Sequence, residues 1–242
     1  MARTYGNGIS VTTDGGGAVN PASHTHAATD ITTGDLADAR LSANVPLLNA
    51  ANAFTGANSF VDTVTLSGDG TAFDDLRVSA TMGTKPATNP PALKAFGPSG
   101  NLQGWAFDKT TAQQIFFEIQ MPHEWKEGST IYPHVHWAPS DTGVGTCIWK
   151  LEYSWAEHGD AFGAPTTITA SDVGGGTAWE HRLIAFESGA GIAATGKTMS
   201  SVLMCRLYRD AATDAYDNDA FLVSFDVHYE IDAFGSDEEY TK

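Results

Sequence analysis

Most of this chain consists of short apolar or alternating runs, each ending in a cluster of Gly, Pro, Asp or Ser. Alternation of apolar and polar side chains is typical of a β-strand with one buried face. A succession of such runs, with few helical signals between them, predicts a β-sandwich. The main expected strands are residues 104–107, 114–121, 131–138, 146–155, 166–169, 180–186, 199–208 and 221–231, and two shorter ones precede them at 60–66 and 74–80.

The first seventy residues differ from the rest, with only eight charged side chains and few aromatic ones. Residues 1–22 are rich in Gly, Thr, Asn and Pro, which predicts an extended arm. From 29 to 60 the apolar residues recur with neither a helical nor a strand period. A segment this thin cannot bury these apolar side chains against itself. It therefore either remains disordered or winds around copies of itself. Three identical chains would bury these side chains on a common axis.

We therefore expect an all-β protein with three parts. Residues 1–22 form an attachment arm, and 23–74 form a thin, intertwined and largely irregular trimeric stalk with short β-strands. Residues 75–242 form a jelly-roll-like β-sandwich head.

The charge balance excludes several classes of partner. The formal net charge is −16 and the Lys and Arg side chains form no cluster, which excludes nucleic-acid binding. The N-terminus lacks the apolar segment of a signal peptide and no stretch is long enough to span a bilayer. We expect synthesis in the cytoplasm and no membrane insertion.

Cys147 and Cys205 lie in apolar runs, which favours buried, reduced thiols.

A first His-x-His pair, His24 and His26, lies in the charge-poor segment. In an extended chain residues i and i+2 project to the same side. Three chains around an axis would present six imidazoles, a cage suited to a divalent transition metal. The alternative is two exposed polar residues in a flexible arm, and no other cofactor is expected.

A second pair, His134 and His136, falls in an expected strand and should share one face of it. With Asp141 they approximate the first metal motif of the cupins, which has Glu where Asp141 stands. The second cupin motif is not recognisable around His158 or His181. A cupin-like metal enzyme and two strand histidines on a subunit contact or a solvated face are therefore the two alternatives.

Other residues give weaker signals for a catalytic, cation or glycan site. The sequence has no GxSxG motif and no phosphate-binding glycine loop, and its scattered carboxylates leave a glycan-cleaving head as an alternative. Asp214, Asp217 and Asp219 fit a solvated acidic edge better than a cation site. Most tryptophans fall in apolar strands, whereas Trp125 and Trp179 have polar neighbours and are the candidates for an exposed glycan contact.

Residues 24–56 read HTHAATDITTGDLADARLSANVPLLNAANAFTG. They contain the elements HxHxxxDI, LxDARL and LLNxxNxFTG in this order. This segment closely resembles a linker repeat found widely in bacteriophage tail fibres and related appendages, and it covers about an eighth of the chain. Residues 75–242, with IYPHVHW, LEYSWA and CRLYRD, resemble head domains of phage virion proteins.

The resemblance implies a non-enzymatic structural protein of the virion, a fibre or spike that forms a homotrimer. It implies that the N-terminal arm docks on other virion proteins of the tail, collar or capsid, and that the head contacts a host-surface glycan or protein. It also implies metal on the three-fold axis for His24 and His26. One copy of the repeat indicates a short appendage.

Overall fold

The computed structural model describes residues 3–5, 9–11, 57 and 72–241 of the 242-residue chain. The chain divides into two units, Met1–Ser59 and Phe60–Lys242. In the first unit, β1 (Arg3–Tyr5) and β2 (Ile9–Val11) form an antiparallel pair. The linker repeat, with His24 and His26, and the strand expected at 60–66 lie outside the described residues.

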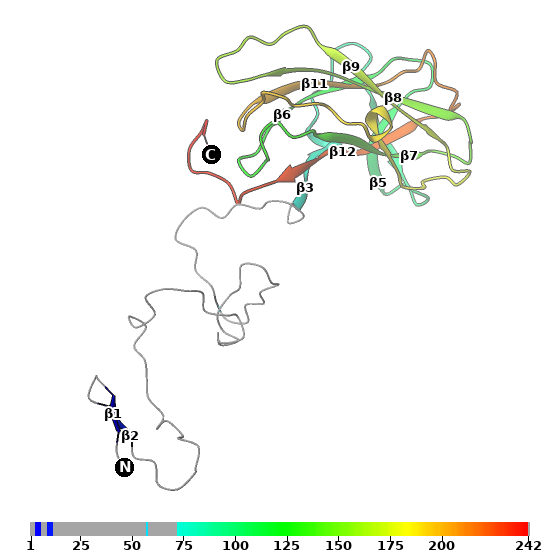
Figure 1. The fold of residues 1–242 in the computed structure, drawn as a ribbon. Coiled ribbons are helices and arrows are strands. Elements are labelled where there is room, and N and C mark those ends of the chain that lie inside the picture. The colour runs from blue at the N-terminus through cyan, green and yellow to red at the C-terminus, as the bar shows by residue number, and fades with distance from the viewer. Residues whose placement is uncertain (1–2, 6–8, 12–56, 58–71, 242) are drawn as a thin grey trace. The chain divides into compact units, whose positions relative to one another are not determined.

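The second unit is a sandwich of two antiparallel sheets, which confirms the predicted all-β class (Figure 1). The larger sheet has the order β10-β7-β12-β5-β4, and β3 also pairs with β12. Its strands are β3 (Ala72–Ser79), β4 (Ala92–Phe96), β5 (Leu102–Phe107), β7 (Tyr132–Pro139), β10 (Arg182–Ala185) and β12 (Ala220–Ile231). The smaller sheet has the order β6-β11-β8-β9. Its strands are β6 (Gln114–Gln120), β8 (Thr146–Ala156), β9 (Thr166–Val173) and β11 (Val202–Arg209).

The core lies between the two sheets and follows from the alternation in each strand. In β6, Ile115, Phe117 and Ile119 point inward and the residues between them point outward. Trp137 of β7 and Trp149 of β8 are both 0% exposed. Because an inward side chain recurs at every second position, apolar area from both sheets is removed from water without a helix.

Strand β12 is central in the larger sheet and pairs with three other strands of it. Along one edge it pairs with β7 from Ala220 to His228. The other edge is shared, because β5 pairs with the first residues and β3 with residues 224–231. The register with β7 shifts between Leu222 and Ser224, so Val223 is the extra residue of a β-bulge.

Both cysteines are free and buried, as predicted. Cys147 lies on β8 and Cys205 on the neighbouring β11, but Cys205 stands opposite Tyr153. Burial raises the pKa of both thiols, to about 12 for Cys205. In the part of the chain that the structure describes, no helix combines the length and apolar character needed to cross a bilayer.

Candidate functional site: a histidine and aspartate cluster on the larger sheet

His134 and His136 of β7 lie with Asp226 of β12 on the outer face of the larger sheet. Asp226 stands directly opposite His134 in the register, and Ser224 stands opposite His136. The residues that alternate with the histidines, Val135 and Trp137, are both fully buried in the core. The period of two that predicted a shared face for the two histidines is therefore confirmed.

The bulge at Val223 is what places Asp226 on this face. Leu222 is 2% exposed and belongs to the core, and in a regular strand Ser224 and Asp226 would project to the same side as Leu222. The extra residue reverses the alternation, so Phe225 and Val227 point inward and Asp226 points outward. One inserted residue thus moves a carboxylate from the core to the histidines.

The three side chains are in close contact. His134 Nε2 lies 2.7 Å from Asp226 Oδ1, and His136 Nε2 lies 3.1 Å from Asp226 Oδ2. The other ring nitrogen of His134, Nδ1, lies 3.2 Å from the carbonyl oxygen of Tyr132. His136 Nδ1 lies 2.7 Å from His181 Nε2, and these two rings are nearly parallel. The four side chains therefore form one connected network.

Burial and charge act in opposite directions on these groups. Burial alone would raise the pKa of Asp226, but the two histidines outweigh it and hold that pKa below its usual value. Burial would lower the pKa of His134, but the Asp226 carboxylate outweighs it and the pKa is raised. For His136, burial and the neighbouring histidines prevail over Asp226, and the pKa is lowered. The carboxylate is therefore ionised at neutral pH, beside two imidazoles with opposite shifts.

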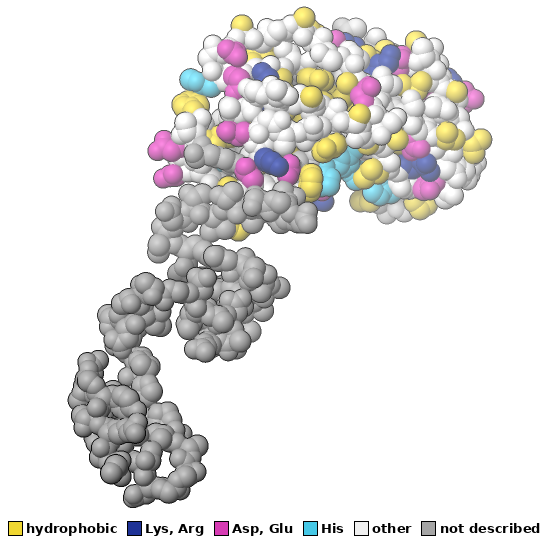
Figure 2. Space-filling view, in the orientation of Figure 1, with side chains coloured by type: hydrophobic (Ala, Val, Ile, Leu, Met, Phe, Trp, Pro, Cys, Tyr) yellow, Lys and Arg dark blue, Asp and Glu magenta, His cyan; other side chains and the backbone are white. Residues whose placement is uncertain are grey.

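The cluster borders a hollow of about 440 Å³. His136, His181 and Asp226 line one side of it, and Arg77 and Met82 are among the residues that line the rest. Figure 2 shows histidine side chains gathered at the lower part of the described surface. The site is thus open to a small molecule or ion from solvent.

Sequence reasoning missed Asp226, and it considered His181 but found no metal motif around it. Asp226 interrupts an apolar run, and its position beside His134 depends on the pairing of β12 with β7 and on a bulge. His181 lies just before β10, whose first residue pairs with Trp137. Asp141, by contrast, is not part of the cluster, because its carboxylate accepts hydrogen bonds from Tyr216 Oη and the Gly143 amide.

The predicted exposure of Trp125 is wrong. Its side chain is 0% exposed and packs beside Trp155 at the end of the sandwich, so no glycan can stack on it. The backbone at Trp125 bridges to Ile231, and its polar neighbours Glu124 and Lys126 are partly buried against β12, where they contact Tyr229 and Glu230. Trp179 is half-buried, and its ring packs edge-on against Phe96 and Phe221.

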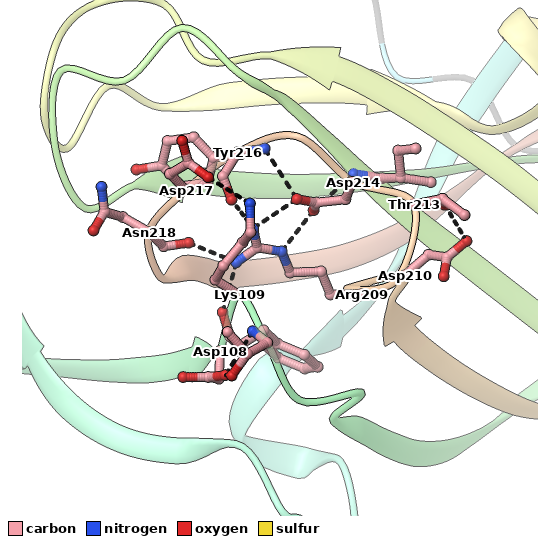
Figure 3. Close-up of polar contacts among 12 residues, drawn as sticks. Asp108, Lys109, Arg209, Asp210, Thr213, Asp214, Tyr216, Asp217 and Asn218 are labelled. Atoms are coloured by element: carbon pink, nitrogen blue, oxygen red, sulfur yellow. Dashed lines mark hydrogen bonds and ion pairs between the residues drawn. The ribbon is translucent and has the colours of Figure 1, made fainter.

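A second polar cluster surrounds Arg209, whose side chain is completely buried (Figure 3). Its guanidinium binds both oxygens of Asp214, at 2.6 and 2.8 Å. It also donates to the carbonyl oxygens of Phe107, Asn218 and Tyr216. Together these five hydrogen bonds match the five N–H donors of the guanidinium.

The three acidic residues considered as a cation site each form an ion pair with a basic side chain. Asp214 is paired with Arg209, Asp217 with Lys109 and Asp219 with Lys94. Each carboxylate already has a basic partner, which argues against a calcium-type site. The prediction of a solvated acidic edge fits the exposed Asp217 but is wrong for Asp214, which is buried.

No protein-family model matches this chain, and no curated protein matches it. Three solved structures resemble the fold at a distance. The first is the CBM22-1–GH10 part of endo-1,4-β-D-xylanase 10B from Clostridium thermocellum with xylohexaose, with 16% identity over 70% of this chain and a TM-score of 0.37. The match spans only 29% of that protein.

The second is TmCBM61 with β-1,4-galactotriose, with 11% identity over 64% of this chain and 86% of that one, and a TM-score of 0.28. The third is CBM28, a module specific for non-crystalline cellulose, with 12% identity over 72% of this chain and 82% of that one, and a TM-score of 0.23. At these TM-scores the three matches carry no functional conclusion.

Proposed function

We propose that this chain is a structural subunit of a tailed-bacteriophage appendage, a fibre or spike that assembles as a homotrimer and has no enzymatic activity. The observation that carries the proposal is the linker repeat at residues 24–56, in which three separate elements of the phage-fibre pattern follow one another in order. Irregular apolar residues in this repeat need partner chains to be buried.

The head domain supports the same proposal. Strands β5-β12-β7-β10 are neighbours in one sheet and β6-β11-β8-β9 in the other, and consecutive strands mostly alternate between sheets. This order fits a jelly roll, the architecture that we infer for the head, which occurs in viral capsid proteins as well as in lectins and cupins. A head of this kind after a thin stalk suits a virion appendage in which the N-terminal arm docks on other virion proteins.

The proposed mechanism is multivalent attachment. Each trimer presents three identical heads, and once one head has bound a host-surface glycan or protein, the others bind at a high effective concentration. Weak contacts by single heads then suffice for stable attachment, and no head needs a catalytic group.

Mass spectrometry of purified phage particles tests the proposal. The chain is expected in particles banded on a density gradient, with a copy number that is a multiple of three. Particles that contain other virion proteins of the same phage but lack this chain would refute the structural role.

A further inference from the structure

We infer that the outer face of the larger sheet binds a divalent transition metal ion, with His134 Nε2, His136 Nε2 and a carboxylate oxygen of Asp226 as its protein ligands. The inference goes beyond the proposed appendage function and does not depend on it. One ligand atom from each of the three residues can be chosen so that all lie within 4.8 Å of one another.

The spacing of these atoms fits one coordination sphere. Two ligand atoms bound about 2.1 Å from the same metal lie about 3 Å apart when they occupy neighbouring positions. His134 Nε2 lies 2.7 Å from Asp226 Oδ1, and His136 Nε2 lies 3.1 Å from Asp226 Oδ2. The two distances run to different carboxylate oxygens, so the side chains would shift for both nitrogens and one oxygen to bind the same ion.

The outer nitrogens of both histidines are held by further partners. The Tyr132 carbonyl can only accept a hydrogen bond, so His134 Nδ1 donates to it and the lone pair of the neutral ring lies on Nε2. His181 Nε2 can accept from His136 Nδ1 and impose the same tautomer on that ring. Histidine ligands in metal sites are oriented by such contacts.

Asp226 is a buried carboxylate that faces two imidazoles. It is 3% exposed, and its Oδ1 lies 2.7 Å from His134 Nε2 without an aligned hydrogen bond among the described residues. A buried carboxylate is costly unless it is paired, and either a proton on His134 Nε2 or a metal ion between the two atoms can supply the positive charge.

The donor set selects the class of metal. Two imidazoles and one carboxylate suit Zn²⁺, Co²⁺, Ni²⁺ or Fe²⁺, whereas Ca²⁺ and Mg²⁺ prefer oxygen ligands alone. Three protein ligands leave at least one position open. The hollow of about 440 Å³ that Asp226 and His136 line gives water or a small oxygen ligand access to that position.

The test measures Zn²⁺ binding by calorimetry on the full chain carrying His24→Ala and His26→Ala, which removes the other His-x-His pair. We expect one Zn²⁺ per chain and, with Co²⁺, visible absorption bands of a coordinated ion. Asp226→Asn in this background should abolish saturable binding. His181→Ala should weaken it about 10- to 100-fold, since it removes only an orienting contact.

His228→Ala is the matched control, because His228 lies on the same strand two residues from Asp226 and is exposed. It should bind as the parent does. If Asp226→Asn does not fold, judged by circular dichroism, His134→Gln replaces it and should also abolish binding. The inference is overturned if the parent takes up neither ion at micromolar concentrations, or if the folded ligand variant binds as the parent does.

Discussion

Three enclosed carboxylates of the sandwich are stabilised in different ways. Asp214 accepts hydrogen bonds from Nε and Nη2 of Arg209. Asp172 accepts two hydrogen bonds from Arg182 and one from Trp137 Nε1. Asp226 has only histidines at this distance among the residues with described contacts. Asp214 and Asp172 therefore have partners that are always charged, whereas the partners of Asp226 are imidazoles, whose charge depends on pH.

The Asp172 pair predicts a specific pH dependence. Burial alone would raise the pKa of Asp172, but its hydrogen bonds from Arg182 and Trp137 outweigh this and lower it. A lowered pKa contributes stability that is present above the unfolded value of about 3.9 and is lost as the pH falls through the folded value. Arg182→Met should lower the free energy of unfolding by about 1.5–3 kcal/mol at neutral pH.

Urea unfolding of wild type and Arg182→Met between about pH 7 and about pH 2 measures this effect. The difference in unfolding free energy should be constant above about pH 5 and shrink below about pH 4. A difference that stays the same down to the acid end would contradict the assignment of this stability to the ionised Asp172.

At the scale of elements, a buried arginine holds the loop between β11 and β12. Arg209 ends β11 and bonds the carbonyl oxygens of Tyr216 and Asn218 in the loop as well as that of Phe107 at the end of β5. The loop therefore connects both sheets through one side chain.

Arg209→Met should destabilise the protein by about 3–5 kcal/mol, because it leaves Asp214 charged and buried without its partner. Chemical denaturation monitored by tryptophan fluorescence measures the change. Lys94→Met is the control, since it breaks an ion pair with Asp219 on the surface and should cost about 0–1 kcal/mol. Equal losses in the two variants would show that burial of the Arg209 pair is unimportant.

The strands were predictable from the sequence because their alternation is local. Each of the eight runs expected after residue 100 contains a strand, and so does 74–80. The sequence analysis missed β4 because its side chains are mostly exposed and it pairs only with β5, so no alternation marks it. Edge strands of this kind carry little apolar pattern.

The candidate site was predictable only in part. Two histidines on one strand face follow from the period of two, but their partners come from other strands. Asp226 reaches them through a bulge, which no local pattern in the sequence marks. The prediction for Trp125 failed for another reason. Its polar sequence neighbours suggested an exposed side chain, but the side chain is fully buried in the core.

At the scale of the whole molecule, the described sandwich buries a core between its own two sheets. The apolar residues of the linker repeat have no such core in the sequence around them. We therefore propose that the repeat drives trimerisation and that the head is a module carried by it. The proposed metal site belongs to the head alone, with one ion per chain, whereas an ion held by His24 and His26 would be shared by three chains.

The most direct test of the central claim is the mass of the intact chain in solution by light scattering. The trimeric appendage predicts three times the 25.6 kDa of one chain. Leu47→Asp with Leu48→Asp should dissociate the trimer by placing charges on its axis, whereas Thr32→Asp with Thr33→Asp, which adds the same charge, should not. A wild-type mass of one chain at micromolar concentration would contradict the account.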